Sequence, residues 1–542
     1  MADAEKKGGA DGDRWTGERS AAGDRSPWLI ATVISISAFM EVLDTAIANV
    51  SLRHIAGATS STYDQATWVL TSYLVANAIV IPLSGWLSDT IGRKRYYMSS
   101  VAVFSLASLM CGLAPNLPFL IGARILQGIA GGGLQPSTQA MLVDTFPPQK
   151  RGQAMAMFGF TVILAPTIGP VLGGYITDHF SWHWIFLINV PVGMLSLVLV
   201  QAYVDEPKVL IEEREQRWRR GIRLDTVGFM LIAIGLGFLE VTMDRGERAD
   251  WFQSPYIWLS ATLAVLGLVG FVIWELSDRA PLLDLRLFKN RNFAAATFII
   301  MIVGVILFGT TQFMPQLLQE VLGYTATSAG LAMTAGGAVT LIAMPIAGLL
   351  SNRVQPRYLI GFALLVESFA LWNLTQLNTQ MAFSDAAIGR MWQAVGIPFM
   401  FVPLTTIAYV GLPRKASGQA SALLNVGRNI GGSIGISAVQ TFLATREQFY
   451  QSRFTETLNP LNPVYSPGLD QIVRQLVSHG QSQMAASQIA LGQLYRALLK
   501  QASMLAFIDV FWVLMVFVAV ITPSIFFLRN NPKLDAPAKV AA

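Results

Sequence analysis

Cysteine, histidine and charged side chains are all scarce in this chain of 542 residues. A single cysteine, Cys111, excludes an intrachain disulfide and any cysteine-ligated metal cluster. Only four histidines are present, and no Walker A phosphate loop occurs, which argues against direct drive by ATP. Charged residues make up 13% of the chain, whereas ordinary soluble proteins carry roughly a quarter. This scarcity of charge excludes a soluble globular protein.

Apolar sequence is abundant instead. Hydrophobic residues make up 53% of the chain, and apolar stretches of about twenty residues, the length that crosses ~30 Å of hydrocarbon, recur along it. These stretches begin near Trp28, Ala66, Tyr96, Phe119, Gln153, Trp184, Leu224, Pro255, Asn292, Ala326, Tyr358, Asp385, Gly418 and Met504. The sequence therefore predicts an all-α polytopic membrane protein with 14 transmembrane helices.

Basic residues gather in alternate connections between these stretches. They occur in 93–95, 150–151, 214–223, 279–291, 353–357 and 414–415. Because short cytoplasmic loops carry an excess of Lys and Arg, we expect these loops and both termini to be cytoplasmic. Residues 1–27 are predicted to be a disordered cytoplasmic tail, and 529–542 a second cytoplasmic tail. The net charge of +5 is attributed to these loops and not to nucleic-acid binding.

The chain repeats itself halfway along. Arg124-Ile-Leu-Gln127-Gly128 returns as Arg390-Met-Trp-Gln393-Ala394. Segment 152–154 returns in the same frame as 418–420, and slightly upstream 82–89 returns as 345–352. A spacing of about 265 residues, held across several helices, indicates a duplicated multi-helix half. Parallel repeats of this size are typical of transporters that rock about a central cavity.

The repeat also predicts the domains. We expect an N-terminal six-helix bundle at 28–205 and a C-terminal one at 292–528, with two extra transmembrane helices at 224–275 between them. Cytoplasmic linkers are expected at 206–223 and 276–291. The segment 444–503, inside the second bundle, is predicted to be extracytoplasmic, with an amphipathic helix around Leu491, Leu494 and Leu498. That helix either packs on its own domain or the membrane surface, or docks to a periplasmic partner.

Two charged residues are predicted to meet inside the first bundle. Asp44 lies about six residues, roughly 9 Å at 1.5 Å per residue, below the outer end of the first span. Arg124 lies at a similar depth in the fourth span. An ionisable group at membrane depth is costly and needs a partner or a task. The pair is either a permanent bridge that fixes packing, or a proton switch in which Asp44 is neutralised from outside and releases Arg124.

Further polar residues lie on helix faces that we expect to border a cavity. Glu41 shares a face with Asp44 and is an auxiliary proton-coupling or substrate-facing carboxylate. The predicted substrate cavity comprises Asn49, Gln127, Gln135, Gln139, Arg390, Asn425 and Arg428. Glu367, Asp385 and Asp509 are expected to be buried charges that are either paired or line the cavity.

Two glycine-rich segments are predicted to move. The turn after the second span forms a cytoplasmic gate, in which charged contacts are broken and remade; its residues are Gly85, Asp89, Gly92, Arg93 and Lys94. In the fifth span, prolines remove backbone donors and kink the helix, while glycines give a smooth face for a neighbouring helix. The residues of this hinge-like span are Pro166, Gly169, Pro170, Gly173 and Gly174.

These motifs resemble those of the major facilitator superfamily, and in particular its fourteen-span drug/proton antiporters of the EmrB/QacA type. The resemblance covers nearly the whole chain and is carried by the first-span motif 43–50, the loop motif 85–95, the fourth-span motif 124–128 and the fifth-span antiporter motif 169–174. Segments 68–73, 189–191 and 285–293 are similar to the EmrB branch. One departure is Ser51-Leu52-Arg53, where the family usually continues Ala-Leu-Pro; it places a charge near Asp44.

The resemblance implies a major facilitator fold and a proton-coupled multidrug efflux antiporter for hydrophobic or amphipathic toxic compounds. It also implies the bacterial inner membrane, a periplasmic adaptor of the EmrA type and an outer-membrane channel of the TolC type. The expected energy source is the proton gradient, with no cofactor and no metal. The alternatives are a facilitator or exporter for a specific metabolite or siderophore, and a membrane enzyme acting on lipids; the scarcity of histidine disfavours the enzyme.

Overall fold

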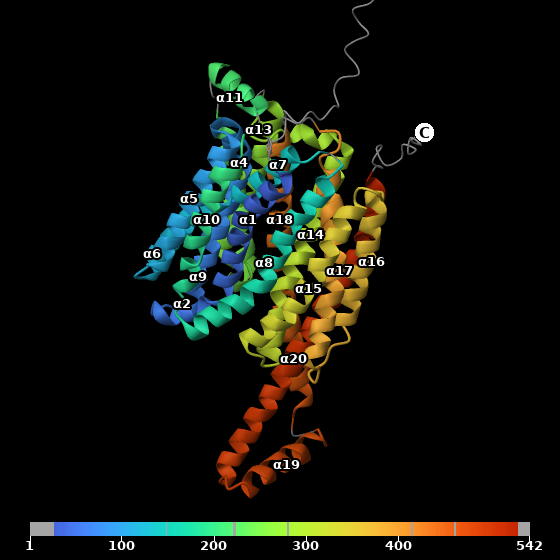
Figure 1. The fold of residues 1–542 in the computed structure, drawn as a ribbon. Helices are drawn as coiled ribbons and strands as arrows, with labels where there is room; N and C mark the ends of the chain where they lie inside the picture. Colours follow the sequence, from blue (N-terminus) through green and yellow to red (C-terminus); the bar gives the residue numbers. More distant parts are fainter. Residues whose placement is uncertain are drawn as a thin grey trace, which may run out of the picture.

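The computed structural model describes residues 26–528 except 148, 207, 221–223, 279–280, 413–415 and 460–461, and this part is built of helices (Figure 1). Almost all of the two predicted tails lies outside the described residues, as do the loop residues Arg279, Arg414 and Lys415.

The first half runs from Pro27 to Tyr203. Its helices are α1 (Pro27–Val50), α2 (Leu52–Ala58), α3 (Tyr63–Ala66), α4 (Trp68–Ile91), α5 (Arg93–Gly112), α6 (Leu117–Gly131), α7 (Leu134–Thr145), α8 (Arg151–His179), α9 (Trp184–Leu187) and α10 (Asn189–Tyr203).

A surface helix and a helical pair connect the halves. The elements are α11 (Lys208–Arg220), α12 (Thr226–Arg245), η2 (Glu247–Ala249), η3 (Trp251–Gln253), α13 (Pro255–Ser277) and η4 (Leu285–Lys289). The second half comprises α14 (Arg291–Gln316), η5 (Leu317–Val321), α15 (Ala326–Leu350), α16 (Pro356–Leu374), α17 (Phe383–Ile407), α18 (Ser417–Thr457), α19 (Tyr465–Ser478), α20 (Gln483–Ile521) and η7 (Thr522–Phe527).

Eleven helical segments of the described residues are long and apolar enough to cross a membrane. Helices α5, α17 and α18 are not among them: α5 and α18 are rich in serine and charged residues, and α17 carries Asp385, Arg390 and Gln393. They nevertheless pack within the bundle, α5 against α6, α17 against α15 and α16, and α18 against α14. The predicted number of fourteen spans stays a prediction.

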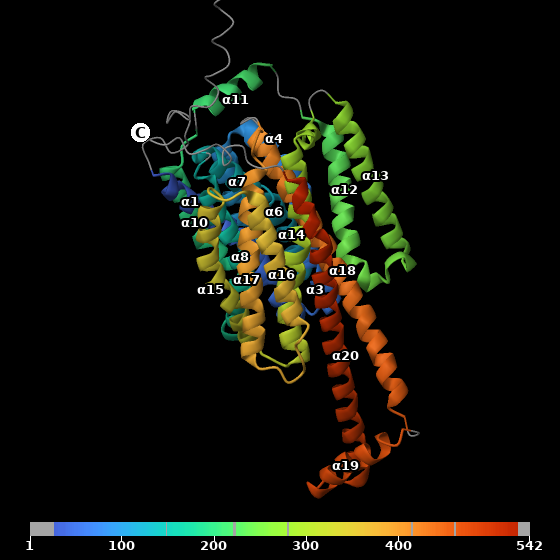
Figure 2. The same ribbon diagram turned by 90° about the vertical axis from the view of Figure 1, so that its right-hand side faces the viewer.

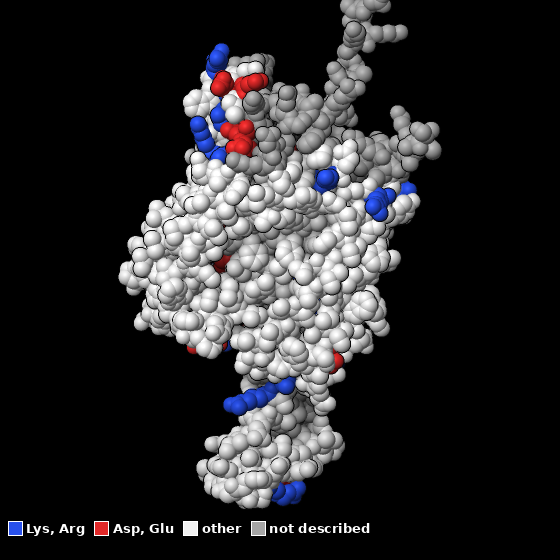
Figure 3. Space-filling view, viewed as in Figure 1, with Lys and Arg blue, Asp and Glu red and all other residues white. Residues whose placement is uncertain are grey.

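The two ends of the bundle differ. We call the end at which α11 lies the terminal face, and the opposite end, from which α19 projects, the hairpin face (Figures 1 and 2). Arg93 lies at the terminal face, since its amide donates to Glu206, which also accepts from Arg214 of α11. Charged side chains gather around α11 on the terminal face, whereas the surface between the two ends is almost free of them in the view of Figure 3. This distribution is that of a bundle whose middle band lies in hydrocarbon.

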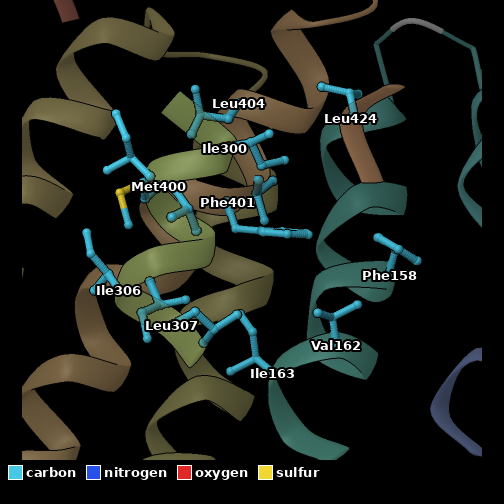
Figure 4. Packing of buried hydrophobic residues seen from close by; sticks show 14 of the residues in the cluster. Phe158, Val162, Ile163, Ile300, Ile306, Leu307, Met400, Phe401, Leu404 and Leu424 are labelled. Atoms are coloured by element: carbon cyan, nitrogen blue, oxygen red, sulfur yellow. The ribbon is translucent and has the colours of Figure 1, made fainter. Parts of the chain in front are cut away.

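An apolar core joins the two halves. Phe158, Val162 and Ile163 of α8 face residues of α14 and α17 (Figure 4). The rings of Phe158 and Phe401 stack at a centroid distance of 6.2 Å. Burying a large apolar side chain stabilises by roughly 1.5–3 kcal/mol, so this continuous core holds the halves together along α8.

The repeated glycines meet across the halves near the terminal face. A Cβ atom added to Gly85 of α4 would lie 3.3 Å from the backbone of Gly418 in α18. One added to Gly152 of α8 would lie 2.9 Å from the carbonyl oxygen of Gly348 in α15. Gly85 and Gly348 occupy matching positions in the two halves, as do Gly152 and Gly418. The internal repeat therefore relates the two close approaches.

The inserted pair α12–α13 lies at one side of the bundle (Figure 2). Helix α12 packs against α4, where Asp244 accepts a hydrogen bond from Thr71. On the other half, Ser433 Oγ of α18 donates to Glu240 Oε2 at 2.6 Å. The pair therefore contacts both halves.

A helical hairpin projects from the bundle; it consists of the outer parts of α18 and α20 with α19 between them. It projects because α18 and α20 continue beyond the apolar stretches. Helix α18 has 41 residues and α20 has 39, which is about 60 Å each at 1.5 Å per residue. Most of the segment 444–503 is thus helical, and α19 caps it by packing Leu469, Ile472, Val473 and Leu476 against Ala486 and Ala490. Leu491 is exposed while Leu498 is buried.

Candidate functional site

Asp44 and Arg124 are in contact inside the first half. Arg124 Nη1 lies 2.5 Å from Asp44 Oδ2, and the two side chains are almost fully buried. Gln127 joins them, accepting from Arg124 Nη1 at 2.7 Å and donating from Nε2 to Asp44 Oδ1 at 3.0 Å. We call Asp44, Arg124 and Gln127 the first acid cluster.

The sequence of α6 explains this arrangement. Asn116 caps the helix by accepting from the Phe119 amide at 2.9 Å, which sets where α6 begins. Arg124 and Gln127, three residues apart, then lie on one face. Gly128 lets α4 approach, since a Cβ there would lie 2.9 Å from that of Ala76. The guanidinium lies 4.2 Å from the centre of the Tyr73 ring of α4.

Two residues that bond to the first acid cluster were not predicted. Asn189, at the start of α10, donates from Nδ2 to Asp44 Oδ1 at 2.6 Å and to Ser108 Oγ at 2.9 Å. Ser108 of α5 also accepts from Gln127 Nε2 at 3.1 Å. The available signal was an asparagine inside the apolar stretch that begins near Trp184, but sequence alone does not tell that it reaches α1.

Glu41 forms a separate cluster one turn away. Its carboxylate accepts from Tyr73 Oη at 2.9 Å, from Asn77 Nδ2 at 3.3 Å and from Gln135 Nε2 at 2.6 Å. Gln135 in turn accepts from Arg428 of α18. Glu41 is therefore linked to the second half through one amide, whereas Asp44 is held entirely by the first half.

The predicted cavity residues divide into three groups. Gln135, Gln139, Asn425 and Arg428 lie on the seam between α7 and α18, where Asn425 Nδ2 donates to Gln139 Oε1 at 2.9 Å. Gln127 and Arg390 are buried within their own halves. Asn49 is exposed at the hairpin end of α1. That these residues line a substrate cavity stays a prediction.

At the terminal face, Arg93 reaches across the seam. It forms a buried ion pair with Asp144 of α7, and its Nη2 donates to Ser417 Oγ of α18 at 3.0 Å. Ser417 Oγ also donates to Asp144 Oδ1 at 3.3 Å. Asp144 and Ser417 were not predicted, because neither stands in the loop motif.

The other gate residues lie in the same turn. Gly92 ends α4 with a φ of 106°, a conformation that favours glycine. Lys94 Nζ donates to the Gln201 carbonyl within the first half, at 3.0 Å. Asp89 lies near Gly418 of α18: a Cβ added to Gly418 would lie 3.6 Å from Asp89 Oδ1. Arg93 and its ion-pair partner Asp144 both belong to the first half, and both bond to Ser417 of the second half, which joins the two halves at this face.

The fifth-span residues place α8 against the first acid cluster. Pro166, Gly169, Pro170, Gly173 and Gly174 all lie inside α8, which runs without interruption from Arg151 to His179. Gly169 and Gly173 face α1: a Cβ at Gly173 would lie 3.1 Å from Ile47 Cγ2, and one at Gly169 would meet Ala46. The contact is therefore two and three residues from Asp44.

Three further charges have separate environments. Asp385 is exposed, so the expectation that it is buried was wrong: it stands in the first turn of α17 and accepts from the Ala382 amide at 2.9 Å. Asp509 is half-buried and accepts from Arg446 Nε at 2.5 Å and Tyr450 Oη at 2.9 Å. Glu367 is fully buried beside Gln393.

Comparison with known proteins extends these observations. The model of the Major Facilitator Superfamily matches residues 34–436. The multidrug export protein EmrB of Escherichia coli strain K12 is 38% identical over 485 residues, 89% of this chain and 92% of that protein. The fatty acid resistance protein FarB of Neisseria gonorrhoeae is 36% identical over 449 residues, 83% of this chain and 87% of that protein.

Solved structures share the fold at low sequence identity. The proton:xylose symporter XylE, bound to 6-bromo-6-deoxy-D-glucose, matches with a TM-score of 0.56 and 14% identity, over 93% of this chain and 96% of that one.

Proposed function

The chain belongs to the major facilitator superfamily, as a transporter of the EmrB type, and on that premise we propose that it exports hydrophobic or amphipathic compounds in exchange for protons. The predicted family, fold and transporter class are confirmed. The names of EmrB and FarB, a multidrug exporter and a fatty acid resistance protein, support amphipathic cargo for this chain as well.

The observation that carries the proposal is the buried contact between Asp44 and Arg124. Burying a charge inside the membrane costs free energy, so a buried charge needs a partner or a task. The attraction between a carboxylate and a guanidinium is mostly lost when a proton binds to the carboxylate. Proton entry at Asp44 therefore frees α1 from α6. Because α1 packs on α8, and α8 packs on α15 of the second half, this release reaches the seam.

Substrate is proposed to bind along the seam beside Glu41 and Arg428. Here a carboxylate and a guanidinium are joined through Gln135, so a ligand that takes the place of this amide contacts both halves. Such a ligand shifts the equilibrium between the two conformations of the transporter only by the difference in its affinity for them. With the terminal face closed by the bonds of Arg93 and Asp144 to Ser417 of the second half, release is directed to the hairpin face.

The test is ethidium accumulation in inside-out vesicles with an imposed pH gradient. The wild type is expected to transport ethidium only when the gradient is present. Asp44→Asn is expected to fall to background, because it cannot take up a proton. Asp470→Asn, on the exposed surface of α19, is the matched control and should retain the wild-type rate. Full gradient-dependent transport by Asp44→Asn would contradict the role of Asp44.

We further propose that the chain lies in a bacterial inner membrane with its terminal face in the cytoplasm. The basic loops of the terminal face support this orientation. The hairpin would then project into the periplasm, where an adaptor of the EmrA type, joined to a channel of the TolC type, would contact it. The exposed side chains of Val464, Met484 and Tyr495 offer apolar contact area there.

A further inference from the structure

The second half contains a buried acid beside the repeated Arg–Gln pair. Glu367 of α16 is 0% exposed, and Arg390 and Gln393 of α17 are 2% and 0% exposed. We call these three residues the second acid cluster. Nothing in the transport mechanism proposed above uses them.

The two clusters share one hydrogen-bond pattern. In the first, Arg124 Nη1 donates to Gln127 Oε1, and Gln127 Nε2 donates to Asp44 Oδ1. In the second, Arg390 Nη1 donates to Gln393 Oε1 at 3.2 Å, and Gln393 Nε2 donates to Glu367 Oε1 at 3.5 Å. The arginine and glutamine are supplied by the sequence repeat. The acid is not, since it comes from α1 in the first half and from α16 in the second.

The acids differ in how well their charge is compensated. Asp44 accepts from Arg124, Gln127 and Asn189 at 2.5–3.0 Å. Glu367 accepts one long bond, and its Oε2, which lies over Gly396, has no hydrogen-bond partner among the described residues. A buried carboxylate with so few donors is costly when ionised, whereas its protonated form is not.

Among the described residues, the counter-charge beside Glu367 is Arg390 of α17, which is linked to it through Gln393. Helix α20, also packed on α16, carries Asp509, but that carboxylate accepts from Arg446 and Tyr450. The residues of η7 are uncharged. Glu367 can therefore hold a proton in one conformation and release it where Arg390 comes closer.

We propose that Glu367 is a second proton-binding carboxylate, so that each half of the transporter binds one proton per cycle. The inference rests on the proposed proton-coupled export. When substrate binds, the O–H bonds of the Asp44 and Glu367 carboxyl groups break, both protons pass to water, and each carboxylate remains beside its Arg–Gln pair.

The experiment counts protons released when ethidium is added to the purified full-length protein in weak buffer. The wild type is expected to release two protons per molecule, and Glu367→Gln and Asp44→Asn one each. Glu367→Asp, which retains a carboxyl group, should restore two. Glu275→Gln is the matched control, since Glu275 of α13 is also buried but stands outside both clusters.

The outcomes separate the two proposals. A wild type that releases no proton on binding ethidium contradicts proton-coupled export itself. A wild type that releases two while Glu367→Gln also releases two contradicts the role of Glu367. If Glu367→Gln does not fold, the infrared difference spectrum of the wild type decides: ethidium should remove two protonated-carboxyl bands, and the loss of only one overturns the proposal.

Discussion

At the residue scale, the site depends on how many donors each buried carboxylate has. Asp44 and Glu41 are three residues apart on α1, yet one is held by a guanidinium and the other by neutral donors. Hydrogen bonds to charged groups contribute about 1.5–3 kcal/mol each. Changing one donor around Asp44 should therefore alter transport measurably without removing the acid.

Asn189→Ala tests this directly. It removes one of the donors that hold the Asp44 carboxylate in place, and the initial rate of ethidium transport should fall by about tenfold, since a loss of about 1.4 kcal/mol corresponds to a factor of ten. The measurement is the initial transport rate in proteoliposomes.

Ser196→Ala is the matched control. It removes a buried hydrogen bond to Ser37 between the same two helices, α1 and α10, but does not touch Asp44. An equal decrease of the rate in both variants would assign the effect to helix packing.

At the element scale, glycines set how closely helices approach. Helix α18 packs along α14, and a Cβ on Gly435 would lie 2.6 Å from Val305 Cα and 2.8 Å from its carbonyl oxygen. Backbone cannot turn aside as a side chain can, so α18 would have to move away from α14. The fifth-span glycines of α8 do the same against α1, beside Asp44.

Gly435→Ala should therefore destabilise the protein. Overpacking costs about 1–3 kcal/mol, which exceeds the gain of about 1 kcal/mol that alanine brings to a helix. We expect a lower Tm of the detergent-solubilised protein. Gly492→Ala, in α20 where nothing lies within 4 Å of the added Cβ, should leave the Tm unchanged or raise it. A Tm decrease in both variants would contradict the packing argument.

At the scale of the whole molecule, transport and partner contact are assigned to different parts. The two halves and their seam hold every residue proposed for proton and substrate binding. The hairpin lies beyond them, and α19 packs on the outer part of α20. Its removal should leave the transport core intact.

Replacing residues 462–482 with a Gly-Ser linker separates the two roles. Ethidium transport by the purified variant in proteoliposomes should equal that of the wild type. Co-purification with a co-expressed adaptor of the EmrA type should be lost, and with it the drug resistance of the cells. Adaptor binding that survives the replacement would place the contact outside residues 462–482.

Sequence alone determined the class of the molecule and much of its site. Long apolar stretches determined a helical membrane protein, and the repeat of Arg124 and Gln127 at Arg390 and Gln393 determined two related halves. Equal depth on two helices was enough to pair Asp44 with Arg124, because helical rise is fixed.

Tertiary structure decided what reaches these groups from elsewhere in the chain. Asn189 joins Asp44, Ser108 joins Gln127, Asp144 and Ser417 join Arg93, and Glu367 joins Gln393, each from a different helix. Helical periodicity fixes which residues share a face, but the rotation and neighbours of that face depend on how all the helices pack. The length of the hairpin arms was also visible only in the structure. Helices α18 and α20 continue where their apolar sequence ends, and α19 packs on the outer part of α20.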